Sequence, residues 1–236
     1  VGWRMTFFSI GVFSALTFLY IAWRLPKVPS GGGFSPKKLP ELLRHKGIMG
    51  LYLFTLLISS AIYVAYSYIE PFLKQVSLMP DDWVTTALMV FGGAGLLGSI
   101  AFSKYYNRNR KLFITVNVAA MALCLLLLYP VSSGFLPIIV LLAVWGATAT
   151  AYNVAMQSNM ILVTTPESTP VAMSIFSGIF NLGIGSGAFF GGAICSDLSI
   201  SYIGLAGGVL ALIGLVYWAA KLGNRIEPKD TLDKYL

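Results

Sequence analysis

Residues 47–69 read GIMGLYLFTLLISSAIYVAYSYI and carry no charged side chain. A helix that crosses the hydrocarbon layer of about 30 Å needs about 20 such residues. Six other stretches of the 236-residue chain are comparably long and apolar, so we predict seven transmembrane helices and an all-α membrane protein. The predicted spans are Met5–Trp23, Gly47–Ile69, Trp83–Phe102, Leu112–Tyr129, Leu136–Met160, Val171–Cys195 and Tyr202–Ala220.

The composition leads to the same fold class. Hydrophobic residues make up 57% and charged residues 11% of the chain, and the mean hydropathy is +0.78. A soluble domain carries about 25% charged residues, so a soluble enzyme, a disordered tail and a secreted disulfide scaffold are excluded. Cys124 and Cys195 lie in apolar runs without further ligands at metal-binding spacing, so we expect buried thiols, no metal and no cofactor.

The basic residues give the predicted helices an orientation. All but two of them, Arg4 and Lys74, lie on one side of the spans. The residues on that side are Arg24, Lys27, Lys37, Lys38, Arg44, Lys46, Lys104, Arg108, Arg110, Lys111, Lys221, Arg225, Lys229 and Lys234. Positive residues mark the cytoplasmic side, so we expect the N-terminus outside and the C-terminus on the cytoplasmic side. Membrane topology therefore explains the net charge of +7 without nucleic-acid binding.

Residues 25–46 differ from the spans because Pro, Gly and Ser are frequent among them. This composition is typical of a flexible linker, in which we expect Leu39–His45 to form a short amphipathic turn on the inner membrane surface. His45 is the only histidine and lies outside the apolar zone, so we interpret it as a solvated linker residue rather than a proton relay. The chain begins with Val1, which favours a fragment over a signal peptide.

Polar side chains form a row along one face of the second span. They are Tyr52, Ser59, Tyr63, Tyr66 and Glu70, at spacings of 7, 4, 3 and 4 residues. Polar groups are unfavourable in lipid, so this face is expected to look into the bundle interior or a hydrated cavity. We interpret Tyr63 and Tyr66 as cavity-lining. The alternative is an interfacial belt of aromatic side chains, which fits Tyr68 and also Tyr66 but not Tyr63.

Glu70 is a carboxylate at the outer end of the second span, and Pro71 after it bends or ends the helix. Three roles remain open for it: binding a substrate hydroxyl, taking up a proton, or being solvated at the helix end. A carboxylate at a helix C-terminus opposes the helix dipole, which favours a specific role.

Amide and hydroxyl side chains are frequent in the fifth span, where Gly146, Thr150, Asn153 and Gln157 share one face. Carboxamides both donate to and accept from hydroxyls, which suits a sugar-like or polyol ligand. The alternative is a set of hydrogen bonds between helices, each worth about 0.6 kcal/mol in lipid. Both interpretations remain open at this stage.

The sixth span is rich in glycine, and Gly183, Gly187 and Gly191 repeat at intervals of four residues. Rows of small residues let two membrane helices approach closely, so we predict a tightly packed helix. The third span has a similar pattern in Gly92, Gly93, Gly95 and Gly98.

Asn181 lies at mid-depth in the sixth span beside Phe180, with Phe176 about one turn away. An amide flanked by aromatic faces suits a sugar, and core packing is the alternative interpretation. Sugar binding requires the polar faces of the second, fifth and sixth spans to converge on one hydrated hollow.

At these segments the sequence resembles bacterial sugar efflux transporters of the major facilitator superfamily, in its drug/proton antiporter branch. The similar stretches are Ala65–Phe72, Gly92–Gly95, Met156-Gln157 and Phe176–Gly185. The resemblance extends over nearly the whole chain. It implies that residues 1–24 are the sixth helix of that fold, 25–46 its cytoplasmic interdomain linker, 47–224 its C-terminal six-helix bundle and 225–236 a cytoplasmic tail, with the N-terminal half missing.

The resemblance also implies a function: proton-driven efflux of sugars or similar small polar solutes by alternating access, in a bacterial inner membrane. The partners would be solute, protons, the lipid bilayer and the missing N-terminal half, and the chain would not be an enzyme. The predicted substrate-binding residues are Tyr63, Tyr66, Asn153, Gln157, Phe176, Phe180 and Asn181. We expect the proton-coupling carboxylate in the missing half, with Glu70 as the candidate within this chain.

One motif departs from the family. The cytoplasmic loop motif of the superfamily runs Gly-x-x-x-Asp-Arg-x-Gly-Arg-Lys, whereas here Gly98 is followed at the aspartate position by Phe102. Only the basic cluster Arg108, Arg110 and Lys111 remains. The charge lock that this loop forms in the family is therefore not expected here.

Three other classes of protein are alternatives to a sugar efflux transporter. A multidrug/proton antiporter of the same branch is the chief alternative, and its cavity should be more aromatic and poorer in amides. A seven-helix receptor is disfavoured because Tyr202–Ala220 contains neither a retinal-binding lysine nor an Asn-Pro element. An intramembrane enzyme is disfavoured because the spans contain no Ser/His pair and no facing carboxylates.

Overall fold

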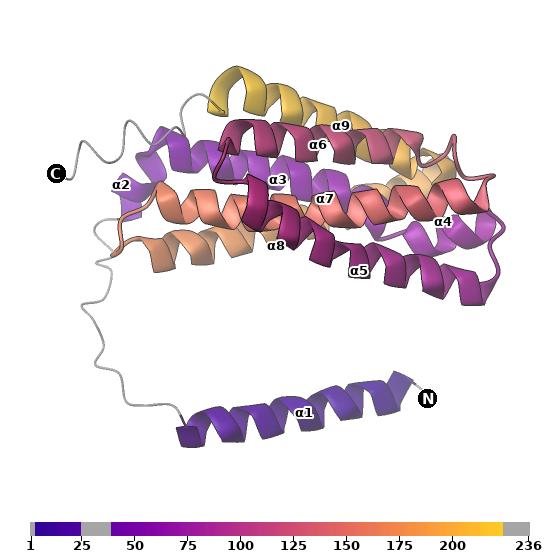
Figure 1. Cartoon of the computed structure of the whole chain (residues 1–236), viewed down its shortest axis with the longest axis horizontal. Coiled ribbons are helices and arrows are strands. Elements are labelled where there is room, and N and C mark those ends of the chain that lie inside the picture. The colour runs from indigo at the N-terminus through magenta and orange to yellow at the C-terminus, as the bar shows by residue number, and fades with distance from the viewer. Residues whose placement is uncertain (1–2, 25–38, 224–236) are drawn as a thin grey trace. The chain divides into compact units, whose positions relative to one another are not determined.

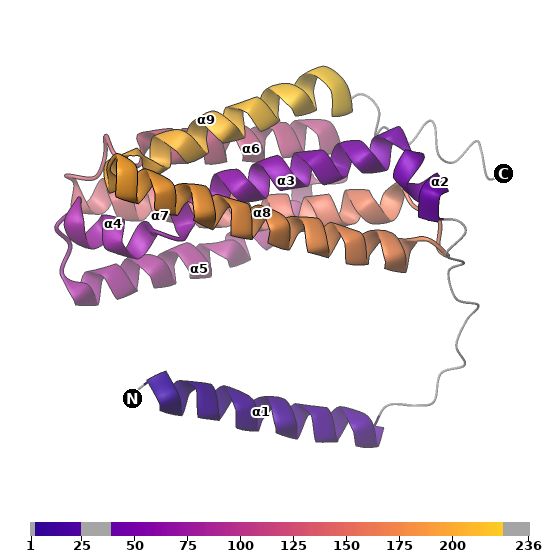
Figure 2. The same ribbon diagram turned by 180° about the vertical axis from the view of Figure 1, so that it is seen from behind.

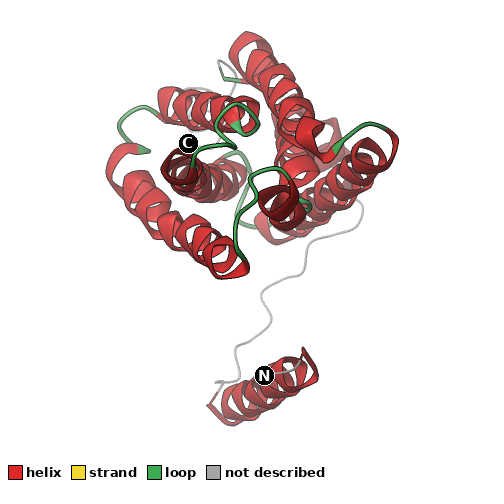
Figure 3. Cartoon of the chain, turned by 90° about the vertical axis from the view of Figure 1, so that its right-hand side faces the viewer, coloured by secondary structure: helices red, strands yellow, loops and turns green. Residues whose placement is uncertain are grey.

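A computed structural model describes residues 3–24 and 39–223, and every regular element within these ranges is a helix (Figures 1 and 3). Seven helical stretches in this part of the chain are long and apolar enough to cross a membrane, which confirms the predicted all-α membrane fold. The chain separates into two units, Val1–Gly33 and Phe34–Leu236. The predicted linker residues 25–38 and the predicted tail, 225–236, lie outside the described residues.

The first unit contains α1 (Trp3–Arg24). Residues 4–24 of this helix are exposed, including Phe13 at 76% and Trp23 at 78%. A helix that is apolar on all sides is stable only when lipid or other helices cover it, so α1 has the character of a membrane span.

The second unit is a bundle of helices. Its elements are α2 (Leu39–Arg44), α3 (Lys46–Tyr66), α4 (Ile69–Gln75), α5 (Asp81–Tyr105), α6 (Arg110–Leu127), α7 (Phe135–Leu162), α8 (Thr169–Asp197), η2 (Ile200–Tyr202), α9 (Ile203–Tyr217) and the π-helical turn η3 (Trp218–Leu222). Helix α3 packs on α8 and α9, α5 packs on α7, and α6 lies against α7 and α9 (Figures 1 and 2).

The contact between α3 and α8 is made through glycine, as the four-residue repeat predicts. A Cβ atom on Gly187 would lie 2.6 Å from the carbonyl oxygen of Ser60, and one on Gly191 would lie 2.5 Å from that of Val64. Gly183 is likewise against Ser59. Residue numbers rise together along both helices, so α3 and α8 run in the same direction with their backbones in close contact.

Only half of the glycine pattern of α5 serves packing. Gly98 lies against the carbonyl group of Ala147 and Gly95 against the Thr150 side chain, both on α7. Gly92 and Gly93 are exposed, and a Cβ on either would meet no atom within 4 Å. The prediction of close packing is therefore confirmed for Gly95 and Gly98. It is wrong for Gly92 and Gly93, because these residues point away from α7.

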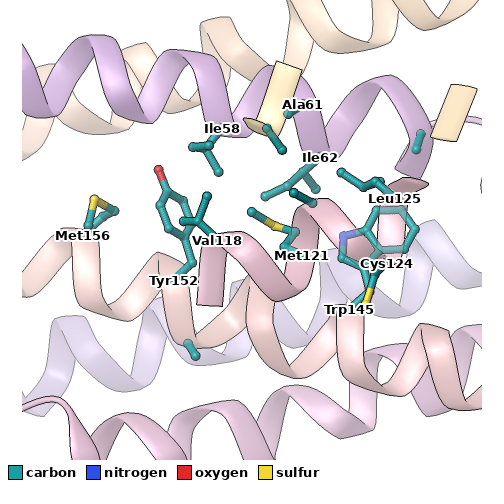
Figure 4. Close-up of a cluster of buried hydrophobic side chains, with 14 of the residues drawn as sticks. Ile58, Ala61, Ile62, Val118, Met121, Cys124, Leu125, Trp145, Tyr152 and Met156 are labelled. Carbon is teal, nitrogen blue, oxygen red and sulfur yellow. The ribbon is translucent and has the colours of Figure 1, made fainter. Parts of the chain in front are cut away.

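Apolar side chains of α3, α6 and α7 meet in the bundle core, where Ile58, Met121 and Trp145 are fully buried (Figure 4). Trp218 of η3 closes one side of the core. Its ring stacks on Phe54 with centroids 5.1 Å apart, and its indole N–H donates to Thr115 Oγ1 at 3.1 Å. Of the two cysteines, Cys124 is buried as expected and Cys195 is half-buried.

The second predicted span is broken near its C-terminal end. Helix α3 ends at Tyr66 rather than Ile69, and α4 begins after a turn at Ser67 and Tyr68. Pro71 has no N–H to donate, and its ring would clash with the carbonyl group of residue 67, four positions earlier. The bend predicted from Pro71 therefore falls one turn before the proline.

At the opposite end, α2 forms within the segment for which we predicted an amphipathic turn, with Leu42 buried and Leu43 exposed. His45 follows it and is the N-cap of α3: its Nδ1 accepts a hydrogen bond from the backbone N–H of Ile48 at 3.3 Å. His45 is exposed, as expected for a linker residue, but it has a capping function that the sequence did not indicate.

The cap leads to a first prediction. We expect His45→Ala to lower the free energy of unfolding by about 1 kcal/mol, because one N-terminal N–H of α3 loses its acceptor. His45→Asn, which restores a side-chain acceptor, should unfold like the wild type. Denaturant unfolding in detergent measures both, and an unchanged His45→Ala protein would contradict the assigned cap.

Candidate functional site

An aromatic cluster joins four helices of the bundle. We define it as Tyr63 and Tyr66 of α3, Phe91 of α5, Trp145 of α7 and Phe180 of α8. The Tyr66 ring lies 5.0 Å from Phe91 and 6.3 Å from Trp145 between centroids, and Phe91 and Trp145 are 5.3 Å apart. Trp145 is fully buried whereas Tyr66 is 37% exposed. Tyr66 therefore exposes part of its ring on the surface of the bundle, while Phe91 and Trp145 pack against the rest of it.

Tyr63 extends this cluster towards α8. Its ring lies 5.6 Å from Tyr66 and 6.3 Å from Phe180, both in edge-to-face geometry. Edge-to-face pairs place the positive edge of one ring against the negative face of another. Three of the predicted binding residues, Tyr63, Tyr66 and Phe180, thus lie in one continuous set of rings.

Tyr52 and Ser59, the N-terminal members of the polar row on α3, form hydrogen bonds within the bundle. The Tyr52 hydroxyl donates to the carbonyl oxygen of Ala172 on α8 at 3.0 Å, and Ser59 Oγ donates to that of Thr55 at 2.6 Å. Both side chains are buried, so this part of the row faces the bundle interior. The predicted binding residue Phe176 is also buried, at 4% exposure, and its ring packs in the hydrophobic core. Its place beside a solute stays a prediction.

The amide side chains predicted on α7 are paired with each other. Gln157 Nε2 donates to Asn153 Oδ1 at 2.6 Å, with Gln157 exposed and Asn153 half-buried. Because one amide holds the other, the pair keeps a donor on Asn153 and an acceptor on Gln157 for further partners.

Asn181 on α8 is exposed, and its amide N–H donates to the carbonyl oxygen of Ser177 at 2.8 Å. Its oxygen remains as an acceptor. Among the described residues, no hydrogen bond connects Asn181 with Asn153 or Gln157. The ring contacts join α3 with α5, α7 and α8, but convergence of all three polar faces on one hollow stays a prediction.

Glu70 lies in the first turn of α4, not at the C-terminus of a long helix. The helix break reverses the expected electrostatics, because a carboxylate is favoured at a helix N-terminus. Glu70 Oε1 accepts from Lys74 Nζ at 3.0 Å, and the same ammonium group lies 3.0 Å from Asp81 Oδ1 at the start of α5. Lys74, for which the sequence suggested no role, therefore links the two helices.

These three charged side chains line an open pocket of about 540 Å³. The lining residues are Glu70, Lys74, Asp81, Val84, Thr85, Leu88 and Met89. Leu88 lies three residues before Phe91 on α5, about one helical turn from the aromatic cluster, and Glu70 follows Tyr66 by four residues across the helix break.

A sequence model of the Major Facilitator Superfamily matches residues 1–161 and 109–234 of the chain. The chain belongs to the major facilitator superfamily. It is therefore a multi-pass membrane transporter, and members of this superfamily are transporters rather than enzymes.

The sequence did not single out two members of the aromatic cluster of this superfamily protein, Phe91 and Trp145. One signal was available for Trp145. Tryptophan is enriched at the membrane interfaces, so a tryptophan well inside the predicted span Leu136–Met160 is a candidate for a packing or binding role. Phe91 gave no comparable signal, because phenylalanine is common throughout membrane spans.

Proposed function

We propose that the chain is part of a transporter that exports sugars or similar small polar solutes by alternating access, driven by inward proton flow. The proposed substrate-binding residues are Tyr63, Tyr66, Phe180, Asn153, Gln157 and Asn181, with Phe91 and Trp145 supporting the ring of Tyr66. Helices α3 to η3 would form the C-terminal bundle, and α1 would be the last helix of an N-terminal bundle.

The observation that supports this proposal best is the combination of one exposed ring, Tyr66 of α3, with an amide pair on α7. Tyr66 offers an aromatic face to the apolar C–H side of a sugar, while the Asn153–Gln157 pair offers a donor and an acceptor to its hydroxyls. Ligand sites combine mostly apolar and aromatic walls with a few placed polar groups. An uncharged, hydroxyl-rich solute matches this combination.

The proposed location is a bacterial inner membrane with residue 1 on the periplasmic side. Basic residues gather where α3 and α6 begin and η3 ends, since Gly50 contacts Leu222 and Gly223 contacts Lys111. Positive side chains favour the cytoplasmic side, so this end of the bundle would face the cytoplasm.

Five rings in one cluster also favour the second candidate, a multidrug/proton antiporter. Aromatic faces attract organic cations as well as sugars, and Phe91 and Trp145 make the site more aromatic than its sequence pattern indicated. Uptake into inverted membrane vesicles, with one panel of sugars and one of cationic dyes, separates the two functions. Proton-driven uptake of dyes without uptake of any sugar would overturn the sugar proposal.

For proton coupling we propose that the essential carboxylate lies outside α3–η3 and that Glu70 has a local role through Lys74. Glu70→Gln is then expected to leave proton-driven efflux by the whole transporter within about twofold of the wild type at every pH, because an exposed ion pair contributes little. Lys74→Gln is the matched control and should behave alike. Loss of proton-driven efflux in Glu70→Gln alone would identify Glu70 as the coupling group.

A further inference from the structure

The turn between α5 and α6 is strongly basic. Residues 103–112 contain Lys104, Arg108, Arg110 and Lys111 but no Asp or Glu. The aspartate that precedes these cations in the loop motif of the superfamily is replaced by Phe102. The turn therefore lacks the aspartate of the motif at position 102.

Aromatic rings pack against one another at this turn. The Phe102 ring stacks on Tyr106 at 4.6 Å, and both rings meet Phe113 edge-on at 6.2 and 5.9 Å. The Arg110 guanidinium lies over the Tyr106 ring, 5.6 Å from its centroid. This contact orients Arg110 through a ring face and leaves the N–H groups at its edge able to bind an anion.

Neither Arg108 nor Arg110 forms an ion pair with a carboxylate in the described part of the chain. Arg108 is exposed, while Arg110 is half-buried against Tyr106. The Tyr106 hydroxyl is buried and has no hydrogen-bond partner among the described residues. Burial raises the pKa of this phenol to about 12, so it remains a neutral donor beside Arg110.

Apolar side chains continue from the turn along α6. Leu112 is 56% exposed and Val116 is 55% exposed, and their spacing of four residues places them on one face of the helix. A ligand that combines an anionic head with an apolar chain would satisfy both parts of this surface, whereas a small inorganic anion would use only the charged part.

We propose that the α5–α6 turn binds the phosphate group of an anionic phospholipid through Arg108 and Arg110, with its acyl chain along Leu112 and Val116. Guanidinium groups match phosphate oxygens bidentately. This site requires only that the protein lies in a membrane. If the orientation proposed above holds, the bound lipid belongs to the cytoplasmic leaflet.

Titration of the purified protein in detergent with phosphatidylglycerol, read out by native mass spectrometry, tests the site. A cation near an anionic lipid surface is worth about fivefold in affinity, so R108Q/R110Q is expected to raise the apparent Kd about 25-fold. R108K/R110K keeps the charge and should stay within about fivefold of the wild type. If R108Q/R110Q does not fold, the R108K/R110K protein is the variant on which the Kd is measured.

The matched control is R44Q/K46Q, which removes two exposed cations from the ends of α2 and α3. It should change the Kd for phosphatidylglycerol less than about twofold. An equal loss in this control would mean that the whole basic end attracts lipid diffusely and would overturn the site. Equal binding of phosphatidylcholine, displacement of the lipid by millimolar inorganic phosphate, or an unchanged R108Q/R110Q protein would overturn it as well.

Discussion

Gly187→Val is expected to lower the free energy of unfolding of the bundle by about 3 kcal/mol. A Cβ atom on Gly187 would lie 2.6 Å from the carbonyl oxygen of Ser60 and 3.0 Å from the backbone nitrogen of Val64. Overpacking costs about 1–3 kcal/mol where side chains can adjust. Here the contacted atoms belong to the α3 backbone, so relief requires α3 and α8 to move apart.

Gly185→Val provides the matched control, since a Cβ at Gly185 would have no neighbour within 4 Å. It changes the same residue type on the same helix and should unfold within about 0.5 kcal/mol of the wild type. Unfolding in mixed detergent micelles, followed by circular dichroism, compares the two proteins. Equal destabilisation by both substitutions would show that helix propensity, not contact with α3, determines the effect.

Tyr66→Ala is expected to weaken solute binding about 10- to 100-fold. If Tyr66 contacts the solute, its removal takes away a buried apolar contact worth about 1.5–3 kcal/mol. It also leaves Phe91 and Trp145 without the ring that covers them. Tyr66→Phe keeps the ring and should lose less than about threefold. Equilibrium binding of the best transported solute to the purified transporter measures both variants.

Phe189→Ala is the control for this prediction. Phe189 lies on α8, is 72% exposed, and its only ring contact among the described residues is with Phe190. Its truncation should therefore leave solute affinity unchanged. If Tyr66→Ala and Phe189→Ala weakened binding equally, the aromatic cluster would have no specific place in solute recognition.

The proposed binding residues show what helical periodicity can and cannot predict. Tyr63, Tyr66 and Phe180 were predicted as one site, and their rings lie in one cluster. Phe176, only four residues before Phe180, satisfies the same helical periodicity but is buried. Periodicity assigns residues to a face of a helix; it does not tell how far along that face a neighbouring helix covers it.

Glu70 shows the same limit for electrostatics. The sequence placed it at the C-terminal end of a long helix, where its charge would be unfavourable. The break at Ser67 and Tyr68 makes it a first-turn residue of α4 instead, paired with Lys74. Pro71 indicated that a bend exists, but the position of the break and the bridge from Lys74 to Asp81 depend on how α4 and α5 meet.

The membrane class, the seven spans and the glycine row of α8 were predictable from the amino-acid sequence, because span length, hydropathy and small-residue spacing are local properties of the chain. That Gly98 contacts α7 whereas Gly92 does not depends on how the helices pack. The same packing places Phe91 and Trp145 against Tyr66. These outcomes depend on which helices pack together and at what depth, and residues far apart in the chain fix that jointly.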